Sequence, residues 1–402
     1  MPGWVSMIDC WQKRAGSARN NAMNLPPSNC AGSDVLRTRV AVIGNGPAGI
    51  AAACVLAQAG VDTLLIGQSP GNSLKAGESL PGAALRLLRR LGINTIQTLL
   101  TPDAVLGCTA NASAWGEENW TRQEAIFNPE GGGWHLLRHH FDAMLLEHAR
   151  AQGVQILTGA CRILAPHGCG HRLQVATIRN HTDADITLQA DFLIDATGRK
   201  AWLARRLGGP PVKLSRQLAV VGWMNGLTHD QDNSTRLKSV ADGWWYSARL
   251  PQGLRVAAFH GLPRAVVALS RYPEAFRAAC NASGVLPFSL PEKQCPLKLR
   301  TCDASVTISS QLGGENWLAV GDAALSFDPL SSQGIYFALY SGIRGAEAAL
   351  DCLHSSALAA DALTRYRSMV LQVFESNQRT RRLFYTRELR YRDHAYWQAQ
   401  RQ

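Results

Sequence analysis

TRVAVIGNGPAGIAAACVLAQAGVDTLLIGQ, residues 38–68, contains a strand, a glycine turn, a helix and a second strand in succession. The apolar runs Val40–Ile43 and Val61–Ile66 predict buried strands. Between them, Gly44-Asn45-Gly46-Pro47-Ala48-Gly49 opens an alanine-rich segment. This order is the context in which G-x-G-x-x-G indicates a dinucleotide-binding site rather than a chance set of glycines.

The three glycines of this motif have distinct expected roles. Gly44 permits the tight turn, Gly46 lets the backbone approach a pyrophosphate, and Gly49 lets the helix pack on the strand. The pyrophosphate would bind the free N–H groups at the helix N-terminus, where Ala48 lies.

The end of the second strand departs from the usual dinucleotide pattern. An acid that binds the adenosine ribose is expected about 20 residues downstream of the glycines, but Gly67 and Gln68 stand there. Gln68 can still hydrogen-bond a ribose hydroxyl. Because it carries no charge to repel a 2′-phosphate, this loop alone does not exclude a phosphorylated nucleotide.

The composition is typical of a globular enzyme. The chain has 402 residues, of which 46% are hydrophobic and 18% charged, which is enough for two or three domains. No apolar run reaches membrane-spanning length, and residues 1–21 lack the apolar core of a secretory signal. The ten cysteines form no C-x-x-C pair. We therefore expect a cytoplasmic protein with reduced thiols and no metal site.

The net charge of +11 favours acidic partners. Part of it lies in residues 377–402, where arginines alternate with aromatic residues. This mixture is one signature of nucleic-acid surfaces, but no known nucleic-acid motif accompanies it, and no nucleic-acid partner is expected. We interpret the segment as a C-terminal helix with a solvated basic face. A docking face for an acidic macromolecule is the functional alternative.

We expect four parts in the chain, with functions assigned by the family resemblance given below: residues 1–37 as an N-terminal extension, residues 38–204 and 302–356 as an FAD-binding domain, residues 205–301 as a substrate-binding sheet domain, and residues 357–402 as a basic helical segment. Helices are expected over 81–92, 136–152 and 332–353, and three antiparallel strands between 218 and 260. A second G-x-G-x-x-G after a strand is missing, which favours one resident flavin over a separate nicotinamide domain.

Three further motifs add a family resemblance. Asp195-Ala196-Thr197-Gly198-Arg199, Gly321-Asp322-Ala323-Ala324 and the run from Asp328 to Ile335, DPLSSQGI, together with the glycine motif, resemble the single-domain FAD monooxygenases and flavin-dependent halogenases. The resemblance covers about residues 38–355. It implies an α/β fold of glutathione-reductase type, in the p-hydroxybenzoate hydroxylase subgroup. In that fold a Rossmann-type FAD-binding domain carries an antiparallel substrate sheet and C-terminal helices.

The same resemblance implies several cofactor-binding residues. Asp322 would hold a ribitol hydroxyl, and the helix that opens at Gly334 and Ile335 would point its N-terminus at the flavin pyrimidine, where reduced flavin is negative. Arg138 resembles an arginine that reaches the FAD phosphates, although an exposed helix charge fits it equally well. Ser79 and Gln333 belong to the same implied set.

Within the group, the stretches KAGESLP (75–81), SAWG (113–116) and DGWWYS (242–247) are most similar to the flavoproteins that mature tryptophylquinone enzymes, of the LodB, GoxB and QhpG type. That family hydroxylates a tryptophan inside a small, carboxylate-rich partner subunit. This is a step toward cysteine tryptophylquinone, as in enzymes of the quinohemoprotein amine dehydrogenase type. The resemblance implies FAD, O2 as co-substrate, and NAD(P)H or another reductant. The oligomeric state stays open.

Two groups of residues are candidates for the chemistry. The possible general bases that would assist indole deprotonation are Glu78, Asp328 and His260. The aromatic side chains that could hold an indole are Trp115, Trp244, Trp245 and Tyr246. For each aromatic residue taken singly, packing in the core of the sheet is the competing explanation.

Other functions remain open from the sequence. A flavin-dependent halogenase uses a lysine that our alignment places within residues 108–120, where this chain has none. The halogenase W-x-W-x-I-P pattern is replaced by WWYSARLP over residues 244–251. A small-aromatic hydroxylase, an isoprenoid reductase of related fold and a non-catalytic flavin-binding docking protein are further alternatives.

Overall fold

In the computed structural model, residues 35–401 are described, except residues 70, 72, 165–170, 180–181, 228 and 292–296. Strand β1 (Val35–Ile43) begins within the predicted extension, so residues 35–37 belong to the first sheet. The rest of that extension, residues 1–34, lies outside the described residues. Val35–Gln402 form a single structural unit.

The first sheet is built around the parallel strands predicted at the glycine motif. Its strand order is β19 (Gly313–Gly314), β20 (Trp317–Ala319), β11 (Thr182–Asp195), β1, β2 (Thr63–Gly67) and β8 (Gln155–Thr158). β1 runs parallel to both β2 and β11, with Ile43 opposite Ile66 and Asp195. Antiparallel β9 (Ala160–Ile163) and β10 (His171–Arg179) extend β11. The glycine loop and the turn after β11 therefore lie side by side at the C-terminal ends of the parallel strands.

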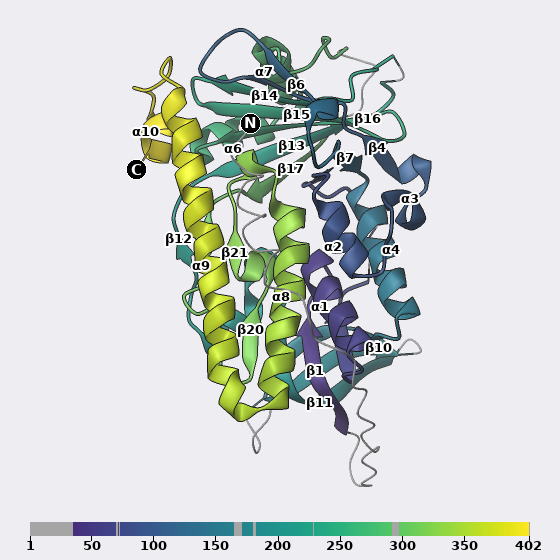
Figure 1. Cartoon of the computed structure of the whole chain (residues 1–402). Helices are drawn as coiled ribbons and strands as arrows, with labels where there is room; N and C mark the ends of the chain where they lie inside the picture. Colours follow the sequence, from purple (N-terminus) through teal and green to yellow (C-terminus); the bar gives the residue numbers. More distant parts are fainter. Residues whose placement is uncertain are drawn as a thin grey trace. The chain divides into compact units, whose positions relative to one another are not determined.

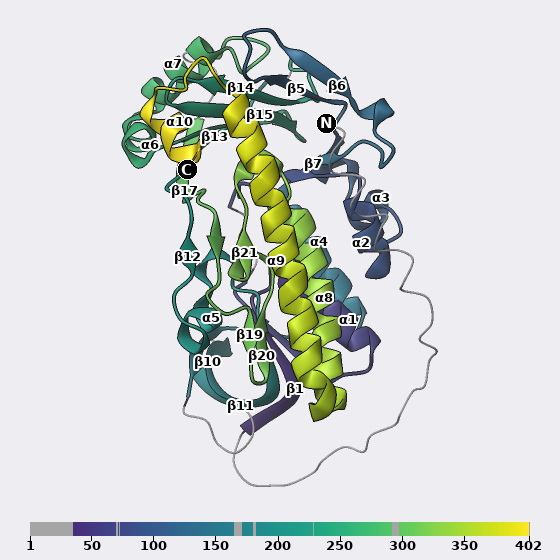
Figure 2. The ribbon, with the colours of Figure 1, turned by 60° about the vertical axis from the view of Figure 1, so that its left-hand side comes forward.

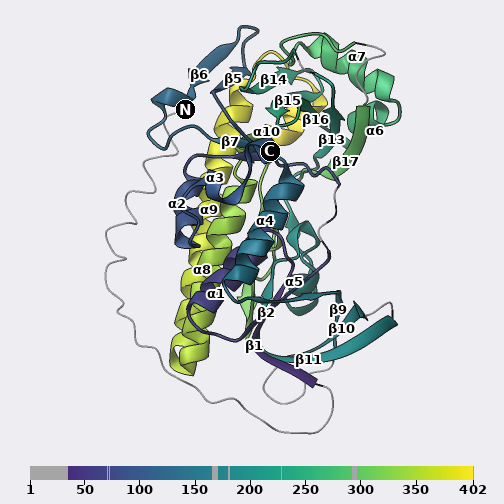
Figure 3. The ribbon, with the colours of Figure 1, turned by 90° about the vertical axis from the view of Figure 1, so that its right-hand side faces the viewer.

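Helices α1 (Pro47–Gln58), α4 (Arg138–Ala151) and α8 (Gly334–His354) pack close to this sheet, and α9 (Ser356–Arg387) runs along α8 (Figures 1 and 3). Small residues let α1 and α8 approach closely, because a Cβ on Gly342 would lie 2.3 Å from the carbonyl oxygen of Ala48. This contact holds the N-terminal end of α1 against the body of α8.

Short helices and two small sheets connect the first sheet to a second large sheet, which is described below. A small sheet contains β3 (Ser79–Leu80), β7 (Trp134–Leu136) and β4 (Val105–Gly107), and the helices α2 (Ala84–Arg90) and α3 (Ile96–Leu99) lie between β3 and β4 in the chain. Helix α5 (Trp202–Leu207) follows β11, and a third sheet contains β12 (Val212–Lys213), β18 (Thr307–Ile308) and β21 (Leu325–Ser326).

The second large sheet has the order β17 (Leu297–Asp303), β13 (Leu218–Met224), β16 (Leu254–Gly261), β15 (Gly243–Leu250), β14 (Thr235–Val240), β5 (Ala110–Ala114) and β6 (Thr121–Glu124). One face packs on α6 (Pro263–Ser270) and α7 (Pro273–Ser283), with Phe276 in the core. The other face packs on the end of α9 and on α10 (Ala395–Arg401), as Figure 2 shows. Because β5 and β6 come from before residue 205, the sheet includes strands from two of the predicted parts, whose boundaries stay predictions.

The predicted α/β fold class is confirmed, and the differences are local. The helix expected over 81–92 is regular only over Ala84–Arg90. Strand β14, TRLKSV, was not predicted, because its polar sequence lacks a clear apolar alternation. On α4, the spacing of Phe141, Met144, Leu145 and His148 predicts one apolar stripe; Phe141 and Leu145 are buried, but Met144 is 42% exposed. No helix among the described residues has the length and apolar character needed to cross a membrane.

Candidate functional site

The glycine loop has the geometry of a nucleotide cradle. Gly44 has a φ of +114°, and a Cβ there would lie 2.2 Å from the carbonyl oxygen of Ala196. A Cβ on Gly49 would lie 1.8 Å from the oxygen of Gly44, whereas a Cβ on Gly46 would meet no atom within 4 Å. Gly44 and Gly49 are therefore required by packing, and the space at Gly46 faces outward from the N-terminus of α1. A pyrophosphate in this space would find the first-turn N–H groups, including that of Ala48, as donors; this contact remains a prediction.

The adenosine end is shaped by Asn45 and the chain after β2. The Asn45 side chain donates from Nδ2 to the carbonyl oxygen of Gln68 at 2.7 Å, and a Cβ on Gly67 would lie 2.2 Å from Asn45 Cγ. Glycine at position 67 is thus explained by close packing. Gln68 is exposed, and its contact with a ribose hydroxyl remains a prediction.

The motif after β11 has a structural role. The buried Asp195 carboxylate accepts hydrogen bonds from the N–H groups of Thr197, Leu203 and Ala204, at 2.7–2.9 Å, and so fixes the turn and the start of α5. Burial raises the pKa of Asp195, and these hydrogen bonds oppose the rise. The turn also presents Arg199 toward the Gly321–Ala323 turn.

Arg199 connects this motif to Asp322. Its Nε lies 3.6 Å from Asp322 Oδ2, and its Nη1 donates to the carbonyl oxygen of Ser305 at 2.7 Å. The surrounding protein raises the pKa of Asp322, and the charges of Arg199 and Arg138 oppose this rise. The Asp322 side chain nevertheless keeps 36% of its surface open. A partly exposed carboxylate at the end of β20 could accept a hydrogen bond from a hydroxyl-bearing ligand such as the FAD ribitol.

The N-terminus of α8 lies at the same end of the parallel strands as the glycine loop. Gln333 precedes the helix with no side-chain cap, and a Cβ on Gly334 would meet no atom within 4 Å, whereas Ile335 is buried in the core. This helix has 21 residues and an open N-terminus. Its free N–H groups can stabilise negative charge on a bound group.

A buried acid lies beside this region. Glu78 is 4% exposed, and burial raises its pKa, against the effects of a hydrogen bond with Tyr246 and the charge of Arg138. The Tyr246 hydroxyl is also 2.9 Å from Ser79 Oγ. Glu78, Ser79 and Tyr246 therefore form one cluster that joins the loop before β3 to the second sheet. The raised pKa lets the Glu78 carboxyl exchange a proton nearer neutral pH than an exposed glutamate would.

Arg138 supports this loop from the first turn of α4. Its Nη1 donates to the carbonyl oxygen of Gly77 at 2.7 Å, and its Nη2 lies 3.2 Å from Asp142 Oδ1. The side chain is 14% exposed, so the sequence-based alternative of a freely exposed helix charge is wrong. A direct contact with FAD phosphate remains a prediction.

His260 and Trp244 form a stacked pair on neighbouring strands. Their ring centroids are 3.8 Å apart with an interplanar angle of 6°. His260 is 5% exposed, its Nδ1 has no hydrogen-bond partner among the described residues, and burial lowers its pKa to about 3. The imidazole is therefore neutral at ordinary pH and able to accept a proton only weakly.

The predicted aromatic residues do not all meet. Trp115 contacts Trp244 edge-on at 6.1 Å and donates from Nε1 to the carbonyl oxygen of Phe384 at 2.8 Å. Trp245 points to the other face of the sheet and packs on Phe276 at 5.2 Å. Side chains alternate across a strand, so Trp245 cannot join Trp244 and Tyr246 at one site. For Trp245 the core-packing explanation is correct.

Asp328 is held by the C-terminal helix. Its Oδ2 accepts hydrogen bonds from Arg381 Nε and the Tyr385 hydroxyl, each at 3.0 Å. The Asp328 and Arg381 side chains are only 2% and 9% exposed. Asp328 therefore anchors the loop before α8, and its carboxylate is already engaged as an acceptor.

This network includes residues that the sequence analysis missed as site residues. Tyr396 donates to Gln217 Oε1 at 2.6 Å, and Trp244 Nε1 donates to the Tyr385 hydroxyl at 3.2 Å. The aromatic spacing of the C-terminal segment was visible in the sequence, but its partners, more than 100 residues earlier, were not.

The C-terminal segment is helical, as expected, but its arginines divide into two sets. Arg381 is buried against Asp328, and Arg390 is paired with Glu118 at 2.6 Å and with Glu388. The expectation of a solvated basic face is wrong for these two residues. It holds for the exposed Arg379, Arg382, Arg387 and Arg392. Tyr385 and Trp397 are fully buried, so they cannot stack on nucleic-acid bases.

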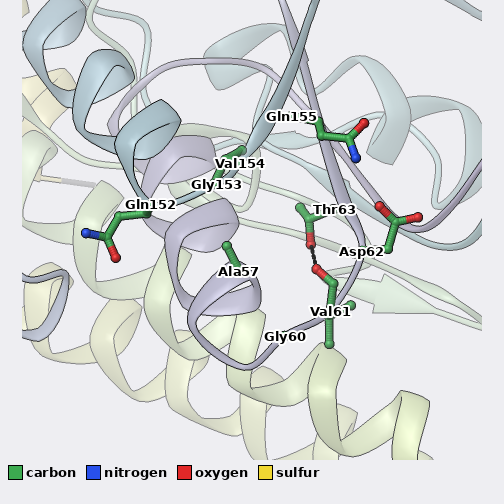
Figure 4. Close-up of a pocket in the computed structure, with 9 residues that line it drawn as sticks. All are labelled: Ala57, Gly60, Val61, Asp62, Thr63, Gln152, Gly153, Val154 and Gln155. Atoms are coloured by element: carbon green, nitrogen blue, oxygen red, sulfur yellow. Dashed lines mark hydrogen bonds between the residues drawn. The ribbon is translucent and has the colours of Figure 1, made fainter. Parts of the chain in front are cut away.

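Two hollows lie in different places. Figure 4 shows a pocket of about 240 Å³ where α1 and α4 end, lined by Ala57, Asp62, Thr63 and Gln152 among others. It lies at the opposite end of α1 from the glycine loop. A cleft of about 510 Å³ lies between residues 73–76 and strands β13 and β17. This cleft adjoins the loop that carries Glu78.

Comparisons with known proteins agree with this geometry. The family described as FAD binding domain matches residues 37–279. The FAD-dependent oxidoreductase LodB of Marinomonas mediterranea is 25% identical over 363 residues, covering 89% of this chain and 95% of LodB. The tryptophan 2-halogenase of Chondromyces crocatus is 23% identical, covering 87% of this chain and 70% of its own.

Among solved structures, the fold is similar to that of the peptidyl tryptophan dihydroxylase QhpG, which is essential for tryptophylquinone cofactor biogenesis. The TM-score is 0.72 at 23% identity, with 90% of this chain and 78% of QhpG covered.

Proposed function

The chain belongs to the FAD binding domain family, and from this premise we propose that it hydroxylates a tryptophan side chain within a small acidic partner protein. It is an FAD-dependent oxidoreductase of the monooxygenase and halogenase type. The proposed reaction belongs to the maturation of a cysteine tryptophylquinone enzyme. The observation that carries it is the buried Glu78–Tyr246–Ser79 cluster on the sheet face beside the predicted flavin-binding elements.

FAD, when bound and reduced, would supply activation of O2 for transfer of one oxygen atom. The glycine loop would hold its pyrophosphate, Asp322 its ribitol, and the N-terminus of α8 its pyrimidine. Glu78 is the candidate to accept the indole proton at its carboxylate, because its raised pKa brings proton exchange closer to neutral pH. The Tyr246 hydroxyl would orient that carboxylate, and the surrounding burial would limit water access.

Halogenation is the second candidate, and one observation favours it. Lys75 lines the cleft next to the Glu78 loop, so an ammonium group does lie near the proposed site. Its Nζ, however, is 2.9 Å from Asp142 Oδ2. Strand β5 and the turn after it, where the resemblance places the halogenase lysine, contain no lysine. These observations favour oxygenation.

The test is the mass of a tryptophan-containing acidic partner. FAD-loaded protein is incubated with a chemical reductant and O2, with and without chloride or bromide. Oxygenation predicts added mass in multiples of one oxygen atom, independent of halide. Chlorinated or brominated product would establish the halogenase alternative, and bound FAD without any product would leave a non-catalytic docking protein. Glu78→Gln should lower the rate without loss of FAD.

A further inference from the structure

The cleft between the two halves has a floor on the second sheet. Val221 and Trp223 are 2% and 3% exposed and lie on the same face of β13, opposite Arg300 and Lys298 of β17. Directly opposite residues of antiparallel strands share a face. Across the cleft, Leu74 packs on this face and Lys75 forms part of the wall. The cleft therefore has an apolar floor and basic side chains on its walls.

The cleft is close to the proposed reaction site. Its lining includes Cys302, which is partly buried. Burial raises the pKa of Cys302, and the charges of Arg199 and Glu78 act on the same thiol. Ala76, two residues before Glu78, also lines the cleft. A side chain that enters here would move toward Glu78 and the residues that would hold the flavin.

Lys75 on the cleft wall is paired with Asp142 at 2.9 Å, but two basic residues of β17 beside the cleft are not paired in this way within the described part of the chain. Lys298 and Arg300 are exposed, and neither has an acidic partner among the described residues. By contrast, Arg381 and Arg390 of the C-terminal segment are engaged with Asp328 and Glu388. Lys298 and Arg300 therefore offer positive charge to a partner beside the cleft, and the exposed Arg382 and Arg387 offer it on α9.

Strand β17 adds a suitable backbone. It is at the end of the strand order, with β13 as its neighbour, and no second strand pairs with it among the described residues. An extended segment can add to the free edge of a sheet through main-chain hydrogen bonds. Exposed basic residues on such an edge select an acidic segment.

We propose that this cleft is the docking site for an extended, acidic polypeptide segment, with Lys298 and Arg300 binding its carboxylates and the cleft admitting its tryptophan. This proposal rests on the proposed function and locates the partner on β17 rather than on the basic C-terminal segment. A cavity of about 510 Å³ has room for an indole and part of its backbone.

The experiment uses FAD-loaded, full-length protein and a labelled peptide that carries one tryptophan flanked by glutamates. Its affinity is measured by fluorescence anisotropy at low and high salt. Lys298→Glu/Arg300→Glu is compared with Arg382→Glu/Arg387→Glu, which makes the same charge change on α9. We expect the cleft variant to bind about tenfold more weakly at low salt, and the α9 variant to change less than about twofold.

Several results would overturn the proposal. They are no binding by the unmodified protein, equal losses in the two variants, or loss of FAD from the cleft variant, since the cleft would then belong to the flavin site. Product mass, measured separately, distinguishes this proposal from the proposed function. Charge-dependent binding in the cleft without oxygenation refutes the function alone. Oxygenation that is unaffected by the cleft variant refutes the docking site alone.

Discussion

Replacing Arg381 with glutamine tests whether the C-terminal helix is part of the core. The guanidinium is 9% exposed, donates to the 2%-exposed carboxylate of Asp328 at 3.0 Å and lies 4.8 Å from the ring centroid of Tyr385. Removing one partner of a buried ion pair leaves the other charge uncompensated and costs about 3–5 kcal/mol. We expect Arg381→Gln to lower the free energy of unfolding by that amount.

The assay is urea unfolding of FAD-loaded protein, followed by tryptophan fluorescence. Arg382→Gln is the matched control, because Arg382 is the exposed neighbour on the same helix, and its cost should stay within about 0.5 kcal/mol. Asp328→Asn should be costly as well, and the double variant should lose less than the sum of the two single changes. A loss below about 1 kcal/mol for Arg381→Gln, with additive effects, would refute a buried anchoring pair.

Three further predictions concern the site. Gly46→Val should leave a folded but colourless protein, because the added side chain would fill only the space for the cofactor. Gly44→Val should instead destabilise the fold, because its side chain would overlap Ala196. Absorbance of bound flavin detects the first effect, and thermal unfolding detects the second. Burial raises the pKa of Glu78 above its ordinary 4.5, so above pH 4.5 the folded protein binds more protons than the unfolded chain, and the unmodified protein loses stability as pH rises. Glu78→Gln lacks this loss, so its free energy of unfolding should rise relative to that of the unmodified protein; urea unfolding of both proteins at several pH values measures the difference. His260 has a pKa lowered from 6.5 to about 3, so it contributes a loss of stability as pH falls through that window, by up to about 1.4 kcal/mol per pH unit. His260→Phe should make this slope shallower without abolishing it, because burial also lowers the pKa of His135 to about 4; an unchanged slope would show that His260 does not contribute.

The local parts of the site were predictable from the sequence. The glycine loop and the helix at Gly334 depend on short-range signals, since glycines and an apolar run are adjacent in the chain. Alternation along β15 also implies that Trp244 and Trp245 face opposite sides. It does not say which side meets the nucleotide-binding half. That choice is made by packing, which places Trp245 against Phe276 of α7.

The long-range parts were not predictable from a single sequence. Asp328 and Arg381 are 53 residues apart, and no local pattern indicates that one neutralises the other. An arginine-rich segment has the same composition whether its charges are exposed or paired, so the sequence favoured a solvated face. The basic cleft on β17 was missed for a similar reason, because Lys75 and Arg300 come together only through the packing of a loop on a sheet.

The central claim is oxygen transfer to a tryptophan within a protein. FAD-loaded protein is given reductant, isotope-labelled O2 and an acidic partner subunit with its tryptophan intact, and the product is mapped by tandem mass spectrometry. We predict labelled oxygen on one tryptophan of the partner, no effect of halide, and little or no reaction with free tryptophan, because contacts remote from the indole position it. Halogenated tryptophan, unlabelled product or efficient turnover of free tryptophan would contradict the account.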